Sequence, residues 1–303
     1  MKTDCYEQLE KILVKNPFRQ EVDQWKKDLQ DFHDGRKQMQ DLRFILKSDC
    51  ENFNKFQNGF ARKNKTRDTF LHPEVLPQPF IGTPCAPVWY LLLNPGYSFL
   101  DRYDHLGILP NQEKYEISAG SNSAELLSKR QELLIEQLCL KADTPFHILD
   151  NSFNTLSNAR GSRKKGGFRW WKANLFGVNR SNGFLFPECG ANATADSMSR
   201  NLFVIECCPY HSQNFDKRIL WEDSEYQIFW KSLIEWAICS GKRFIVRSRN
   251  VFNVLKANGL QVNGENSVGF SNERNVAMTI RNLGEGNQVV LEEIFNALKS
   301  VNN

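Results

Sequence analysis

The sequence of 303 residues lacks a long apolar run, a cysteine pair with metal-ligand spacing and any low-complexity tract. No stretch approaches the roughly 20 apolar residues of a membrane span, so we expect no membrane partner. The opening residues MKTDCYEQLE contain no apolar core or small-residue cleavage site, and we expect no signal peptide. The eight cysteines are scattered without a CxxC motif, which predicts no metal site and reduced thiols in a cytoplasmic protein.

The composition allows a substantial folded core. Hydrophobic residues make up 41 % of the chain and aromatic residues 12 %, which suffices for one large domain or one domain with an extension. The formal net charge of +4 is mild. It is compatible with a nucleic-acid partner, although many unrelated proteins carry as much.

The pattern of apolar residues changes near residue 75. Residues 1–75 place apolar side chains at helical spacing among many charges, which predicts an N-terminal helical region. The segment 72–87 contains five of the eleven prolines and is expected to be a stiff connector. Residues 76–303 then form the second predicted domain.

In residues 76–303, apolar runs alternate with amphipathic segments. This pattern predicts an α/β fold: a three-layer α/β/α sandwich with a mainly parallel, four-stranded sheet. The predicted strands include 88–93, 202–208, 243–248 and 275–280. Ligands bind at the carboxyl ends of such strands, so we expect the residues that follow them to face one another. These are Asn94, Glu206, Arg247 with Arg249, and Arg281 with Asn282 and Leu283.

Two of these strand-end residues allow either a structural or a functional interpretation. Asn94, in the tripeptide Asn94-Pro95-Gly96, is either a turn residue or a polar group that holds a water or a substrate. Glu206 is either a solvated strand end or an acceptor inside a pocket, where burial without partners would be costly.

The sequences LNPG at 93–96 and IECCP at 205–209 resemble two motifs of the uracil-DNA glycosylase superfamily. They are closest to its single-strand-selective and mismatch-specific branches. The resemblance covers residues 80 to 300 and leaves the N-terminal region without a match. It implies a monomeric, monofunctional DNA glycosylase without a cofactor, which flips a base out of DNA and hydrolyses its N-glycosidic bond to leave an abasic site.

Carried over by this resemblance, Asn94 would position the attacking water, and Tyr97 or Phe99 would stack on the flipped base. The alternative for both rings is ordinary packing. Gly96 stands where the strict uracil enzymes have a tyrosine, so the side of the pocket that faces C5 of the base would be open.

Glu206 stands where the family has its base-reading asparagine. An ionised carboxylate only accepts hydrogen bonds. It would therefore accept from N4 of a cytosine-type base, with room for a C5 substituent. A protonated Glu206 that donates to N3 or O2 is the alternative. Modified cytosines are typical of some bacteriophage genomes, so analogy suggests a role in defence against phage DNA.

The family's third motif contains a histidine that this sequence lacks. Arg281 is the first candidate to stabilise the negative charge on O2 of the departing base, because a guanidinium always donates. Asn282 and His211 are alternatives. Leu283 is either an apolar wedge that fills the gap left by the base or a residue that caps the sheet.

The segment 161–175 combines glycines and cations with two tryptophans, as in a phosphate-binding loop. Arg163, Lys164, Lys165 and Arg169, together with Arg247 and Arg249, are the expected DNA contacts. The alternative for this segment is a solvated loop followed by a core helix.

Two other functions remain open from the sequence. A thiol hydrolase would use Cys207 or Cys208 with His211, provided that the histidine lies within hydrogen-bond reach. A non-catalytic nucleic-acid-binding protein would keep the scaffold without the chemistry.

Overall fold

The computed structural model describes residues 2–63, 68–97, 105–106, 123–144, 146, 200–271, 280–283 and 287–300, and all structural statements below concern these residues. The strands are β1 (Phe80–Ile81), β2 (Val88–Leu92), β3 (Leu202–Glu206), β4 (Arg243–Val246) and β5 (Ser267–Gly269). The helices are α1 (Lys2–Leu13), α2 (Phe18–His33), α3 (Cys50–Gly59), α5 (Ser123–Leu138), α8 (Glu225–Cys239), α9 (Arg249–Ala257), α10 (Ile280–Leu283) and α11 (Gln288–Lys299). Short 3-10 turns lie at Met39–Asp41, Lys47–Asp49 and Lys217–Ile219.

The strands form one mixed sheet in the order β1-β3-β2-β4-β5. Strands β3, β2, β4 and β5 run parallel, and β1 pairs antiparallel with β3 at one edge. The α/β class and the mainly parallel sheet are therefore confirmed, but the sheet has five strands instead of the predicted four. β1 and β5 are only two and three residues long, so neither produces an apolar run that sequence inspection would detect.

The last predicted strand, 275–280, is not the fifth strand of the sheet. That position belongs to β5, at Ser267–Gly269, which pairs with β4. Ile280 begins the short helix α10, and residues 275–279 lie outside the described part. Arg281, Asn282 and Leu283 therefore belong to the helix α10.

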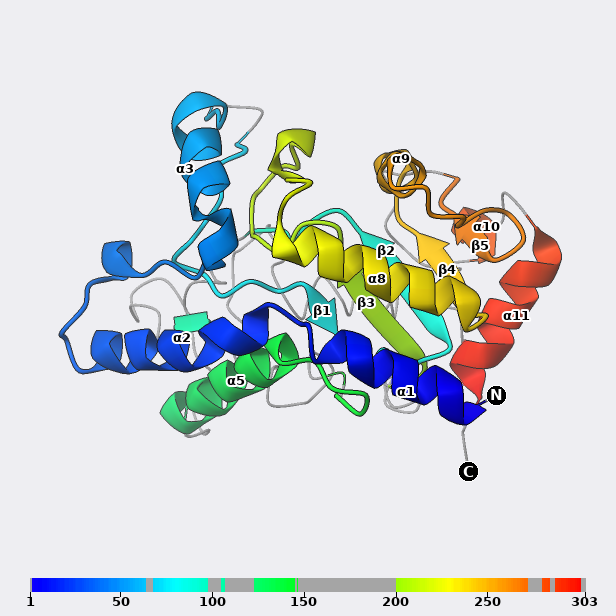
Figure 1. Ribbon diagram of the computed structural model, residues 1–303, viewed down its shortest axis with the longest axis horizontal. Coiled ribbons are helices and arrows are strands. Elements are labelled where there is room, and N and C mark those ends of the chain that lie inside the picture. The colour runs from blue at the N-terminus through cyan, green and yellow to red at the C-terminus, as the bar shows by residue number, and fades with distance from the viewer. Residues whose placement is uncertain are drawn as a thin grey trace.

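Alternate side chains of the strands enter two different hydrophobic clusters, as the two-residue period of a strand requires. Trp89, Leu91, Phe203 and Phe244 pack in a cluster with residues of α1, α2 and α8. On the opposite face, Tyr90, Val204 and Ile245 pack with residues of α11. Figure 1 shows α1 and α8 side by side in front of the strands. Among the described residues, no helix is long and apolar enough to cross a membrane.

The N-terminal helices share the first of these clusters. Leu9 and Leu13 of α1 and Trp25 of α2 are buried in the same cluster as Trp89 of β2. The indole of Trp236 in α8 also donates a hydrogen bond to the carbonyl of Cys5 (2.9 Å). A division near residue 75 therefore separates two sequence patterns, while the hydrophobic core runs across it.

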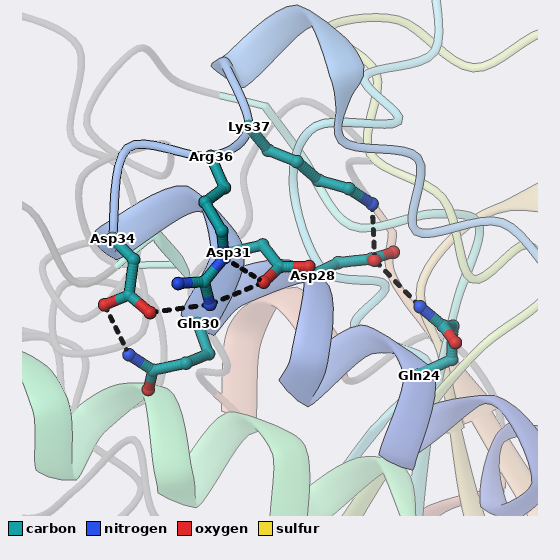
Figure 2. A network of polar contacts seen from close by, with 7 residues as sticks. All are labelled: Gln24, Asp28, Gln30, Asp31, Asp34, Arg36 and Lys37. Carbon is teal, nitrogen blue, oxygen red and sulfur yellow. Dashed lines mark hydrogen bonds and ion pairs between the residues drawn. The ribbon is translucent and has the colours of Figure 1, made fainter.

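A polar network closes the turn after α2 (Figure 2). Lys37 pairs with Asp28 (2.5 Å), and Arg36 pairs with both Asp31 (2.6 Å) and Asp34 (2.7 Å). Gly35 supplies the positive φ of +74° that the turn needs. The pairs of Arg36 lie at the surface, where ion pairs contribute about 0–1 kcal/mol each, so they chiefly fix the local chain path.

Candidate active site

The two motifs lie side by side at the carboxyl ends of β2 and β3. Leu92 is the register partner of Glu206. Beyond the strands, the N–H of Cys207 donates to the carbonyl of Leu92 and that of Cys208 to the carbonyl of Leu93, both at 2.8 Å. The expectation that these strand ends meet is therefore confirmed, and it brings Asn94 to the same edge as Glu206.

The side chain of Asn94 is anchored to the loop that follows β3. Its Nδ2 donates to the carbonyl of Pro95 (2.9 Å) and to the carbonyl and hydroxyl oxygens of Ser212 (3.3 and 3.0 Å). Because carbonyl oxygens only accept hydrogen bonds, the amide atom of Asn94 that faces them must be the nitrogen. All three of these hydrogen bonds use Nδ2, and among the described residues none of the hydrogen bonds at this side chain uses Oδ1. Asn94 thus presents an oriented acceptor, which is what holding a water requires.

His211 links the same loop to Gly96. Its Nδ1 lies 2.7 Å from the carbonyl oxygen of Gly96, so Nδ1 carries the proton and donates. Burial lowers the pKa of His211 to about 4, against the opposing effect of that hydrogen bond. The ring is consequently neutral near pH 7, with Nε2 as an acceptor. A neutral His211 that donates to Gly96 is less suited to stabilising a negatively charged O2, and its role at the leaving base stays a prediction.

The carboxyl group of Glu206 is buried at the end of β3. The residue is 5 % exposed, and Oε2 has no hydrogen-bond partner within the described part of the chain. Burial raises the pKa of Glu206 well above its ordinary value, because a charge here would be poorly solvated. The structure therefore favours the protonated form of Glu206 over the ionised acceptor.

Tyr90, Arg247 and Phe270 form a stack on the same face of the sheet as Glu206. The Arg247 guanidinium lies over the Phe270 ring at 4.8 Å from its centroid, and the Tyr90 and Phe270 rings stack at 6.1 Å with 29° between their planes. Burial raises the pKa of Tyr90, Arg247 lowers it, and Glu206 raises it. Tyr90 thus lies within electrostatic range of both groups.

The sequence interpretation missed Tyr90 and Phe270. Tyr90 stands four residues before Asn94 and two before Leu92, so strand alternation could have placed it on the face of Glu206. Phe270 follows β5, which was itself not predicted.

In the first motif, the ring of Tyr97 is stacked on another side chain, whereas Gly96 has free space around its Cα. Tyr97 stacks on His72, with ring centroids 3.3 Å apart and 4° between the planes. A ring in this position has one face covered by protein. Around Gly96, an added Cβ would meet no atom within 4 Å; that this space would face C5 of a base stays a prediction. Phe99 lies outside the described residues.

The third motif is only partly described. Asn282 is buried, and its carbonyl accepts from the N–H of Ser271 (2.8 Å). Leu283 is 1 % exposed and packs in the second hydrophobic cluster. This burial favours the packing role of Leu283 over the wedge, because a wedge must reach the DNA. The side chain of Arg281 lies outside the described part.

Of the predicted DNA contacts, Arg247 and Arg249 are described. Arg249 is exposed at the first turn of α9. Arg247 is partly buried and stacked on Phe270. Arg163, Lys164, Lys165 and Arg169 lie outside the described residues.

The cysteines of the second motif are not suited to nucleophilic chemistry. Cys207 and Cys208 are fully buried. Burial raises the pKa of both thiols, and the neighbouring Glu206 raises it further. A thiol hydrolase needs the thiolate, so the structure speaks against that alternative. Within the described ranges, no three His, Cys, Asp or Glu side chains gather as a metal-binding group. Comparisons with protein families, with curated proteins and with solved structures find no match for this chain.

Proposed function

We propose that this protein is a monofunctional DNA glycosylase built on a three-layer α/β/α scaffold. It removes a cytosine-type base from DNA, and its pocket has room for a substituent at C5 of the base. The observation that carries the proposal is the burial of the Glu206 carboxyl group. A buried carboxyl with an unsatisfied oxygen is expensive to keep. Glu206 ends β3 at the register position of Leu92, and Asn94, anchored to Ser212, follows two residues later on the neighbouring chain segment.

Asn94 supplies the position of the nucleophile. A water that donates a hydrogen bond to Oδ1 keeps a lone pair directed at C1′ of a flipped nucleotide. The bonds from Nδ2 to Ser212 hold the amide in place before the substrate arrives. Orientation of this kind contributes through the entropy of a prearranged attack.

Glu206 supplies a proton and reads the base. A neutral carboxyl has one donor and one acceptor, which match N3 and the N4 amino group of cytosine. Its proton can pass to N3 as the C1′–N1 bond breaks, so the bonding electrons leave on a neutral base. N3 of uracil already carries a hydrogen and cannot take this proton, which favours cytosine-type bases.

Release of free base from defined DNA tests the proposal. Single- and double-stranded oligonucleotides carry cytosine, C5-substituted cytosines or uracil at one position, and alkaline cleavage and mass spectrometry follow the product. We expect a free cytosine-type base and an abasic site, and no release by Asn94→Ala with DNA binding retained. Asn58→Ala, at an exposed residue of α3, is the matched control.

Two outcomes would contradict the proposal. Binding of DNA without release of any base would identify a non-catalytic binding protein on the same scaffold. Unchanged release by Asn94→Ala would remove the assigned role of Asn94. A role in defence against phages with modified cytosines rests on this activity, and it predicts that the Asn94→Ala variant fails to restrict such phages.

A further inference from the structure

The amide of Asn94 is held by the loop that follows β3. Besides the carbonyl of Pro95, its Nδ2 contacts the carbonyl oxygen (3.3 Å) and the hydroxyl oxygen (3.0 Å) of Ser212. The backbones meet as well, because Gly96 and Ser212 form a parallel bridge and the N–H of Ser212 donates to the carbonyl of Pro95 (3.3 Å). Ser212 is 1 % exposed, so bulk water does not compete for these hydrogen bonds.

The direction of the hydrogen bond between Asn94 and Ser212 is set by Asn214. The hydroxyl of Ser212 lies 2.9 Å from the backbone carbonyl oxygen of Asn214. A carbonyl oxygen only accepts, so the single proton of the hydroxyl goes to Asn214. The hydroxyl oxygen then turns its lone pairs to Asn94, and the amide must present its nitrogen to Ser212. This leaves Oδ1 as the amide atom that can accept from a water.

Asn214 is in turn held by the N-terminal region. The carbonyl oxygen of Asp68 accepts from both the backbone N–H (2.9 Å) and the side-chain Nδ2 (3.2 Å) of Asn214. The carboxylate of Asp68 accepts from the N–H of Phe70 (3.2 Å), which fixes the local turn. A continuous chain of hydrogen bonds thus runs from Asp68 through Asn214 and Ser212 to Asn94.

Two backbone hydrogen bonds support this chain. The N–H of His72 donates to the carbonyl of His211, and the N–H of Gln78 donates to that of Pro209, both at 3.0 Å. The order of these contacts is antiparallel, and it continues into the antiparallel pairing of β1 with β3. The loop that follows β3 is therefore attached at several points to the N-terminal region and the proline-rich connector.

We propose that Ser212 is a positioning residue that fixes the orientation of the Asn94 amide, and that the N-terminal region sets the position of Ser212 through Asn214. This inference rests on the proposed function and deepens it, because it names what makes Asn94 present Oδ1 to the attacking water. Ser212 and Asn214 make no bond to the substrate, and both act through Asn94. The N-terminal region thereby supports the catalytic step.

The test is a double-mutant cycle on the excision rate. Single-turnover release of the cytosine-type base is measured with enzyme in excess for Ser212→Ala, for Asn214→Ala and for the variant that carries both. Ser212→Ala should be about tenfold slower than wild type, because it loses the hydroxyl acceptor and keeps only the carbonyls. Asn214→Ala keeps its backbone bond to Asp68 and should be about threefold slower.

The double variant separates positioning through Asn94 from a general loss of structure. Because Asn214 acts through the Ser212 hydroxyl, Asn214→Ala should cost nothing further once that hydroxyl is absent. The double variant should therefore match Ser212→Ala. The enzyme concentration at half-saturation should stay within about threefold of wild type in all three variants, since no phosphate contact is lost.

A matched serine serves as the control. Ser232→Ala, on α8, removes a hydroxyl that also donates to a backbone carbonyl, that of Ile228 at 3.0 Å, and it should excise at the wild-type rate. The melting temperature of each variant identifies misfolding. If Ser212→Ala does not fold, Ser212→Cys takes its place with a smaller expected loss and the same cycle, because a thiol is a weak acceptor.

Several results would overturn the assignment. Excision by Ser212→Ala at the wild-type rate would show that the hydroxyl does not position Asn94, and it would leave the glycosylase proposal standing. Losses that multiply to about thirtyfold in the double variant would show that Asn214 acts independently of Ser212. Absence of base release by the wild-type protein would refute the proposed function and this inference with it.

Discussion

The buried carboxyl of Glu206 should make the stability of this protein depend on pH. The pKa of a glutamate in an unfolded chain is about 4.3, whereas burial raises the pKa of Glu206 in the folded state. Between the two pKa values the native state binds one more proton than the unfolded state. The stabilisation from this group is therefore fully present below the unfolded pKa and is lost as pH rises through the folded pKa.

The size of the effect follows from the linkage between protons and folding. The free energy of unfolding should fall by as much as about 1.4 kcal/mol for each pH unit in this window. Glu206→Gln keeps the shape of the side chain and cannot ionise, so its stability should lack this contribution. Burial also raises the pKa of Asp49, but Asp49 is present in both proteins and its contribution cancels in the difference.

Urea unfolding from pH 4.5 upwards measures this difference. As pH rises, the free energy of unfolding of wild type should fall relative to that of Glu206→Gln. The free energy of unfolding of the exposed control Glu222→Gln should change with pH in parallel with wild type. The same variant should lose about 10²–10⁴ in excision rate, because an amide has no proton to transfer. Parallel stability curves for wild type and Glu206→Gln would show that Glu206 ionises normally in the folded protein, and the reasoning would fail.

Two other substitutions test the packing around the site. Tyr210→Phe removes the hydroxyl that donates to the buried carboxyl of Asp49 at 2.5 Å and should lower the unfolding free energy by about 1–3 kcal/mol, measured in urea; an unchanged midpoint would mean that the bond contributes nothing. Leu283→Ala should cost about 2–5 kcal/mol in the same assay, because Leu283 is a core residue. Full stability with weakened DNA binding would instead restore Leu283 as a wedge.

The sequence predicted the central strands well because they are long and apolar. The runs around β2, β3 and β4 are bounded by polar or turn residues, and the carboxyl ends of β2 and β3 meet as parallel strands must. The sequence analysis did not predict β1 and β5, because strands of two or three residues are too short to show an alternating pattern of apolar residues. β5 includes a glycine and a serine, so it does not resemble a buried strand.

The chemistry of the site could be predicted only in part. The adjacency of Asn94 and Glu206 followed from the topology, but the protonation state of Glu206 depends on burial by distant segments. The stack of Arg247 on Phe270 joins residues from two strand ends, one of which was unforeseen. Helices α1 and α2 looked like a separate region because an amphipathic helix has the same pattern whichever core it covers.

The central claim, that Glu206 selects a cytosine-type base for excision, is tested most directly by a ratio of rates. Single-turnover release of cytosine-type base is divided by release of uracil from matched DNA, for wild type and for Glu206→Asn. An amide donates and accepts but transfers no proton, so the ratio should favour cytosine in the wild type and move toward uracil in the variant. An identical ratio in both proteins would contradict the claim.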